Sequence, residues 1–113
     1  PHVGRAFRSR PEPEAHTIPA AVEKLQRTID AEEIDLKLVS GCEIMLTPEG
    51  LPERLQNEPW LSFGEKKRYA LVESPLHIWP DWADSVLFQM AKQGITPIIA
   101  HPERLSDVGK NPD

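Results

Sequence analysis

The sequence has 113 residues, of which 39% are hydrophobic and 27% are charged, a composition and size typical of one globular domain or part of one. Thirteen basic against eighteen acidic residues give a net charge of −5, which argues against a protein that binds the nucleic-acid backbone. The single cysteine excludes an internal disulfide framework and fits a reducing compartment, and no apolar run approaches the roughly 18 to 20 residues that membrane insertion needs.

The two ends of the chain suggest an incomplete domain. The sequence starts at Pro1-His2 without an initiator methionine, and it stops at Asp113 where a new helix could begin. We interpret residues 1–113 as one partial domain, an internal piece of a larger protein that is truncated at both ends.

The first half of the chain predicts a loop, a helix and a strand. Residues 1–18 are polar and rich in Arg, Pro and Glu, which favours a loop. Apolar residues at helical spacing predict a helix over 19–33. The run from Leu36 to Glu43 alternates and then becomes mostly apolar, so it predicts a strand that ends near Glu43 or extends beyond it.

The second half predicts short strands and a further helix. A short helix or turn is predicted within 47–58, and a short strand over 60–63. The apolar run Tyr69–Glu73 predicts a buried strand, and helical spacing predicts a helix over 80–93. Residues 95–100 predict a last strand, which must tolerate a break at its proline.

Alternating helices and apolar strands indicate parallel βα units, so the predicted fold class is α/β with a parallel sheet. The three predicted strands are too few to close a barrel. We therefore expect further strands, or a partner chain that supplies them.

Three of the apolar runs end in residues that can bind metal: Glu43, Glu73 and His101. Ligands and catalytic groups collect at the carboxyl ends of parallel strands, so these side chains are expected to converge on one pocket. His2 joins them if a strand precedes it. Carboxylates with imidazole suit Mn, Fe or Zn, and a carboxylate can bridge two ions.

Each residue taken alone has another interpretation. Glu43 could pair with a basic residue at the sheet rim, and His101 could be a hydrogen-bonded core histidine. Glu73 follows a near-apolar run, where an unpaired charge is costly, so it needs a partner of some kind. The three strand ends together favour the metal interpretation.

Arg104 follows the last strand end in the segment His101-Pro102-Glu103-Arg104. A guanidinium there can bind a phosphate bidentately and stabilise charge in a transition state. The alternative is an ion pair with Glu103 or Asp107.

The other reactive residues have simpler interpretations. Cys42 does not head a cysteine-phosphatase loop, because that loop needs an arginine six residues on and position 48 is proline. We predict that Cys42 packs in the core, and that His16 and His77 are solvated in proline-rich loops.

Several segments together resemble a known family. They are Pro1-His2, Ser40-Gly41-Cys42-Glu43-Ile44, Leu71-Val72-Glu73 and the distinctive Ile98-Ile99-Ala100-His101-Pro102-Glu103-Arg104. In order and spacing they are similar to the polymerase and histidinol phosphatase (PHP) superfamily, in its CpsB/CapC-type branch of bacterial capsule-biosynthesis tyrosine phosphatases. The resemblance implies part of a distorted (β/α)7, TIM-like barrel without its N- and C-terminal strands.

The resemblance also implies residue roles around a trinuclear metal site, usually active with Mn. Glu43 would bridge two metals, Glu73 and His101 would complete the ligands of the second, and His2 would bind the third. Arg104 would be the catalytic arginine needed to cleave the phosphate ester. The family's N-terminal His-x-His pair and nearby Asp, and its C-terminal Asp-x-His, have no counterpart here, so most ligands of the first metal and some of the third are missing.

The function implied for the parent protein is metal-dependent protein-tyrosine phosphatase in the cytoplasm. Its protein substrate would be a phosphorylated tyrosine kinase that controls capsule or exopolysaccharide export. Two alternatives stay open: a histidinol-phosphatase-like phosphoesterase, and a catalytically incomplete piece that binds metal poorly and acts as an oligomerising module. Exposed strand edges favour a dimer in either case.

Overall fold

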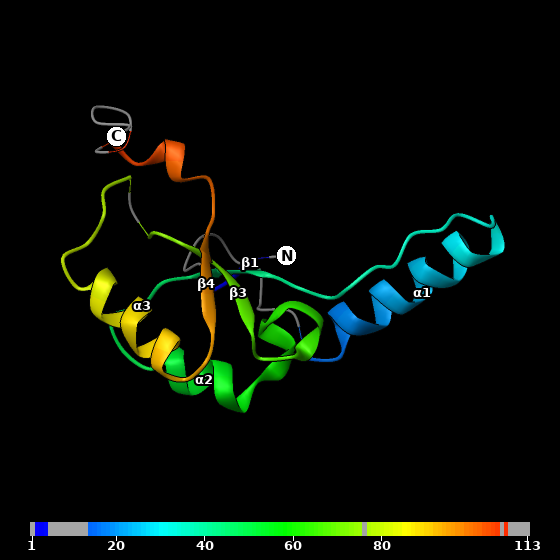
Figure 1. Ribbon diagram of the computed structural model, residues 1–113, viewed down its shortest axis with the longest axis horizontal. Helices are drawn as coiled ribbons and strands as arrows, with labels where there is room; N and C mark the ends of the chain where they lie inside the picture. Colours follow the sequence, from blue (N-terminus) through cyan, green and yellow to red (C-terminus); the bar gives the residue numbers. More distant parts are fainter. Residues whose placement is uncertain (1, 5–13, 76, 107, 109–113) are drawn as a thin grey trace.

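The computed structural model describes residues 2–4, 14–75, 77–106 and 108. Four parallel strands form one sheet in the order β1-β2-β3-β4 (Figure 1). The strands are β1 His2–Val3, β2 Glu43–Met45, β3 Tyr69–Glu73 and β4 Thr96–Ile99. The α-helices are α1 Thr17–Ala31, α2 Leu51–Asn57 and α3 Ala83–Lys92, with 3₁₀ turns at Pro59–Leu61, Phe63–Glu65 and Pro102–Arg104. The predicted α/β class with a parallel sheet is confirmed.

The core lies between one face of the sheet and the helices α2 and α3. Side chains alternate between the two faces of a strand, and Ala70 and Val72 of β3 are fully buried on the helix side. Ile44 of β2, in register with Val72, is buried with them. From the helices, Leu55 and Met90 complete this cluster without exposed surface. The helix layer therefore fixes which residues of each strand face the other way.

The opposite face of the sheet carries a different set of side chains. His2, Glu43, Leu71 and Ile98 are register partners across the four strands, so they share this face. No helix among the described residues covers it, and Ile98 is 42% exposed. The sheet is open across the part of the chain that the structure describes, and its parallel βα order is that of a segment of the expected barrel.

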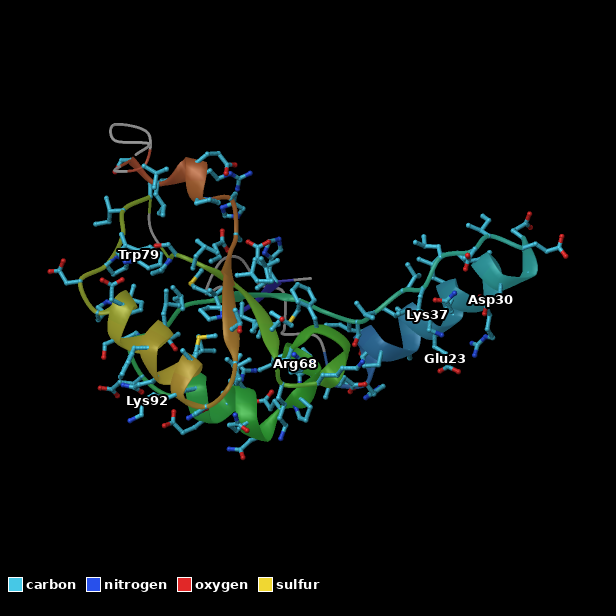
Figure 2. The ribbon with its side chains drawn as sticks, viewed as in Figure 1. Glu23, Asp30, Lys37, Arg68, Trp79 and Lys92 are labelled. Carbon is cyan, nitrogen blue, oxygen red and sulfur yellow. The ribbon has the colours of Figure 1, made fainter. Side chains whose placement is uncertain are left out.

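Helix α1 projects from the body of the molecule and the chain returns along it in an extended segment (Figure 1). The side-chain amide of Gln26 ties the two together: Nε2 donates to the Leu36 carbonyl oxygen at 2.9 Å, and the Leu38 N–H donates to Oε1 at 2.7 Å. Figure 2 shows Lys37 of the returning segment beside the helix that carries Glu23. The helical spacing of apolar residues in this segment accounts for α1. The helix spans Thr17–Ala31, so it begins and ends two residues earlier than the predicted 19–33.

Two strand predictions are corrected. The strand predicted from Leu36 pairs with β1 and β3 only over Glu43–Met45. The chain just before it is held against α1, where the Leu38 N–H donates to Gln26, and it joins the sheet only at Glu43. Residues 60–63 are not a strand. Pro59 has no N–H, the Ser62 hydroxyl donates to the Pro59 carbonyl at 2.7 Å, and Gly64 takes a positive φ, so the chain turns twice here.

The sequence did not predict β1, which is only two residues long and ends at Gly4 with φ of 80°. It supplies the fourth strand and puts His2 in the sheet. The remainder of the predicted N-terminal loop, residues 5–13, lies outside the described residues.

Pro97 does not break β4. The N–H groups of Thr96 and Ala100 both donate to β3 or its preceding residue, so the nitrogen of Pro97, one residue along, faces the outer edge of the sheet. No helix within the described ranges is long and apolar enough to cross a membrane.

Candidate metal centre

Two carboxylates and two imidazoles meet on the open face of the sheet. His2 and Glu43 are the first residues of β1 and β2, Glu73 is the last residue of β3, and His101 follows β4. The Nε2 atom of His101 lies 3.0 Å from Oε1 of Glu43 and 3.4 Å from Oε1 of Glu73. The other oxygen of Glu43, Oε2, lies 3.6 Å from Nδ1 of His2. The structure thus brings together all four side chains that the sequence singled out as metal ligands.

The sheet register explains why three of them converge. His2 and Glu43 are direct partners of β1 and β2, and Glu73 lies two residues beyond Leu71, the partner of Glu43 on β3. A spacing of two residues returns a side chain to the same face of a strand, so all three project on the open face. Glu73 is only 6% exposed, although it carries a carboxylate.

His101 reaches the same point from a turn. The ladder between β3 and β4 continues to Ala100, whose N–H donates to the Val72 carbonyl at 2.8 Å. The next residue, His101, adopts a left-handed backbone with φ of 33° and ψ of 58°, and Pro102 then starts a 3₁₀ turn. Histidine is among the residues that tolerate this conformation. The turn directs the imidazole back across the sheet toward Glu43 and Glu73.

These distances suit a divalent cation. Protein ligands bind zinc and similar ions at about 2.0–2.2 Å, so two ligand atoms on one ion lie within about 4.4 Å of each other. Potential ligand atoms of His2, Glu43 and Glu73 all lie within 4.8 Å of one another, and the closer pairs in the cluster are 3.0–3.6 Å apart. A small adjustment of side chains would let one ion replace the contacts that the imidazoles now make with the carboxylates.

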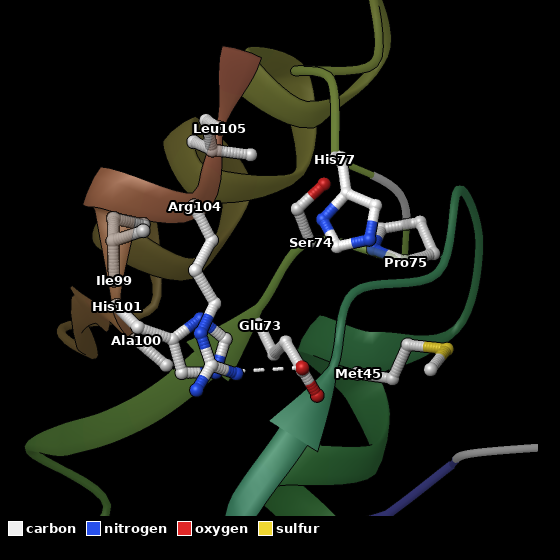
Figure 3. A pocket seen from close by; sticks show the side chains of 10 residues that line it. All are labelled: Met45, Glu73, Ser74, Pro75, His77, Ile99, Ala100, His101, Arg104 and Leu105. Atoms are coloured by element: carbon white, nitrogen blue, oxygen red, sulfur yellow. Dashed lines mark ion pairs between the residues drawn. The ribbon is translucent and has the colours of Figure 1, made fainter. Parts of the chain in front are cut away.

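Arg104 stands beside this cluster at the edge of a cavity of about 500 Å³. Arg104, His101 and Glu73 all line this cavity, and Figure 3 shows Arg104 and His101 on the same side of it. Within residues 2–4, 14–75, 77–106 and 108, no carboxylate forms an ion pair with Arg104, so the predicted alternative of a Glu103 pair is wrong and Asp107 lies outside these ranges. The guanidinium is therefore available to an anion in the cavity.

Cys42 is 4% exposed, and its thiol lies 3.5 Å from the Leu61 carbonyl oxygen, which confirms that it packs in the core. The preceding Gly41 packs against the ring of Phe63.

His16 is solvated beside Glu14 at the start of α1, as predicted. His77 is exposed as predicted, but it also lines the cavity beside the cluster, which the sequence analysis missed. The one feature of the sequence that points to His77 at the site is its position four residues after Glu73, the last residue of β3.

The sequence profile of the family described as "Capsular polysaccharide synthesis, CpsB/CapC" matches residues 1–113, the whole chain. The chain belongs to the CpsB/CapC family.

Relatives of this CpsB/CapC chain include the tyrosine-protein phosphatase YwqE of Bacillus subtilis, 32% identical over 92 residues. They also include CapC of Staphylococcus aureus, a candidate tyrosine-protein phosphatase that is 30% identical over 90 residues. These alignments cover 81% and 80% of the chain but 35% and 34% of the relatives, so the chain spans about a third of their length.

The fold is also similar to a solved member of the family. A structure from work on YwqE of Bacillus subtilis and CpsB of Streptococcus pneumoniae, described as unique metal-dependent tyrosine phosphatases, matches 87% of this chain and 39% of its own. The TM-score is 0.74 and the sequence identity 28%. The observed sheet is therefore the corresponding part of a CpsB/CapC fold.

Proposed function

We propose that the protein containing this chain is a metal-dependent protein-tyrosine phosphatase that acts in the cytoplasm on a tyrosine kinase of capsule or exopolysaccharide synthesis. The observation that carries the proposal is the meeting of His2, Glu43, Glu73 and His101 on the open face of the sheet, with Arg104 in the adjoining cavity. The relatives YwqE and CapC carry names of tyrosine-protein phosphatases, which supports phosphotyrosine hydrolysis as the reaction.

In this proposal the four side chains hold divalent cations, with Mn²⁺ the preferred ion and iron or zinc as alternatives. Glu43 would hold two of these ions, since its two carboxylate oxygens face different imidazoles. Bound divalent ions lower the pKa of water and neutralise charge on a phosphoryl group. The protein's part is to fix the ligands: the sheet holds both carboxylates, and the left-handed turn holds His101.

Arg104 orients the phosphoryl group. A guanidinium can form two parallel hydrogen bonds to phosphoryl oxygens, which fixes orientation as well as adding charge. The rest of the cavity wall includes apolar side chains of Met45, Pro75, Ile99 and Leu105, which can enclose an aromatic ring and exclude water from the reacting end. An aryl phosphate such as phosphotyrosine matches both the polar end and the apolar walls.

A second candidate function concerns the 113 residues taken alone, namely metal binding without turnover. The described cluster supplies four side chains, enough for one tetrahedral ion but not for three. Comparing metal content and activity of the 113-residue chain with those of the complete protein separates this candidate from the first.

The test of the proposed function is hydrolysis of a phosphotyrosine peptide by the complete protein. We expect phosphate release that chelation abolishes and added Mn²⁺ restores. Arg104→Ala should lower kcat/KM at least about 100-fold, the effect of losing one charge-stabilising donor, while bound metal per chain is unchanged. Hydrolysis that survives chelation, or that is unaffected by Arg104→Ala, contradicts the proposal.

A further inference from the structure

The cavity beside the metal cluster contains a second histidine, His77, that the proposed roles do not use. Ten residues line the cavity, and they come from two segments in particular: the loop after β3 and the turn after β4. Figure 3 shows His77 on the β3 side, near Pro75, with Arg104 and His101 on the other side.

The position of His77 is set by its backbone. The Ser106 N–H donates to the His77 carbonyl oxygen at 2.7 Å, which joins the loop after β3 to the chain just beyond Arg104. The Ser74 hydroxyl donates to the Ile78 carbonyl at 2.9 Å and closes the loop itself. His77 and Arg104 are therefore held on facing walls of one cavity.

Among the described residues that line the cavity, His77 has a side chain that can donate a proton and is not already hydrogen-bonded to another group of the protein. The imidazole of His101 contacts both carboxylates, and the hydroxyl of Ser74 donates its hydrogen bond to the Ile78 carbonyl oxygen. Arg104 carries a guanidinium, which does not give up its proton in proteins. The imidazole of His77 is exposed, and within the described part of the chain it makes no hydrogen bond or ion pair. Histidine is also the side chain that most often donates protons in enzymes.

We propose that His77 donates its imidazole proton to the phenolic oxygen of the substrate as the ester bond breaks; this rests on the proposed phosphatase function. The phosphoryl group would lie at the Arg104 and Glu73 end, and the ring beside Met45 and Pro75, which brings the bridging oxygen toward His77.

The oxygen of a water molecule forms the new bond to phosphorus, and the bond from phosphorus to the phenolic oxygen breaks. One proton of this water stays on the released phosphate, and the other passes to solvent. The electron pair of the broken bond stays on the phenolic oxygen, which takes the proton from His77. Because His77 is exposed, it regains a proton from solvent.

Such a donor matters most for a basic leaving group. A tyrosine phenol has a pKa of about 10, so its phenolate is a poor leaving group without a proton. The p-nitrophenolate ion is a far weaker base and leaves without help. A donor at the bridging oxygen therefore predicts an effect of mutation that depends on the leaving group.

The experiment compares phosphotyrosine and p-nitrophenyl phosphate as substrates for the metal-loaded complete protein carrying His77→Ala or His77→Gln. We expect His77→Ala to lower kcat for phosphotyrosine about 100-fold, the lower end of the usual range for general acids, and kcat for p-nitrophenyl phosphate less than about threefold. His77→Gln keeps a hydrogen-bond donor and should lose less on phosphotyrosine. His16→Ala is the matched control, since its imidazole is 80% exposed at the start of α1.

Metal content and thermal unfolding are measured on every variant, and both are expected to equal those of the wild type. Equal losses on the two substrates, or no loss on either, would overturn the role of His77 while leaving the phosphatase proposal intact. If His77→Ala does not fold, a result for His77→Gln with equal losses on both substrates overturns it as well. Failure of the wild type to hydrolyse phosphotyrosine would instead refute the proposed function itself.

Discussion

Glu43 occupies the centre of the cluster, because it faces both imidazoles. One oxygen lies 3.0 Å from Nε2 of His101 and the other 3.6 Å from Nδ1 of His2. A carboxylate that divides its oxygens in this way is suited to bridge two ions. Loss of Glu43 should therefore disturb metal binding more than loss of any other single member.

His101 combines a ligand role with an unusual backbone, and variants can separate the two. His101→Asn and His101→Val both remove the imidazole, but only asparagine tolerates a φ of 33° well. We expect the valine variant to be less stable than the asparagine variant by about 1–2 kcal/mol in chemical unfolding with chelator present. Both variants should lose metal affinity alike. Equal stabilities would show that the left-handed turn is not maintained or carries no cost.

At the scale of elements, the packing of Gly41 against Phe63 fixes where β2 begins and therefore where Glu43 lies. A Cβ at this position would lie 2.4 Å from Cδ1 of Phe63 and 2.6 Å from Cε1, and Glu43 follows two residues later. We expect Gly41→Ala to displace the ring and to cost about 1–3 kcal/mol in unfolding free energy. It should also weaken metal binding, because the start of β2 moves with it.

Phe63→Leu tests this contact by making room for the added methyl group. In a double-mutant cycle the two changes should couple by about 1 kcal/mol or more, so that the pair is more stable than the separate costs imply. Gly50→Ala is the control: it sits at φ of 78° with nothing within 4 Å, and Phe63→Leu should not relieve its cost. Equal coupling for both glycines would contradict the packing explanation.

Features of the structure that are set by neighbouring residues can be predicted from the sequence, whereas features set by contacts with distant residues cannot. The strand Tyr69–Glu73 was predicted with its bounds, because a continuous apolar run ends at Ser74-Pro75. Pairing of β2 could not be predicted from Leu36 onward, because Gln26, ten residues earlier, holds that segment against α1. The strand-end pattern predicts Glu43, Glu73 and His101, although Glu43 begins β2 rather than ending it, and His2 joins them only through the family resemblance and the short strand β1. The pattern could not find His77, whose placement depends on a backbone bond to Ser106, twenty-nine residues away.

For the molecule as a whole, the open face of the sheet carries apolar surface. Tyr69 is 44% exposed and Ile98 42% exposed on this face, and β1 and β4 have outer edges without partners among the described strands. We expect the 113-residue chain alone to self-associate at tens of micromolar, as measured by sedimentation velocity. Ile98→Lys should reduce the association, and Leu25→Lys, on the helix α1 that projects from the body of the molecule, should not. A wild-type chain that stays monomeric would contradict this expectation.

We propose above that His2, Glu43, Glu73 and His101 bind divalent metal, with Glu43 at the centre of the cluster. The most direct measurement is a Mn²⁺ titration of the complete protein, comparing wild type, Glu43→Gln and the control Glu53→Gln, whose side chain is exposed on α2. We predict that the control binds as the wild type does, while Glu43→Gln loses at least one bound ion per chain or about tenfold or more in affinity. Unchanged stoichiometry and affinity in Glu43→Gln would contradict the account.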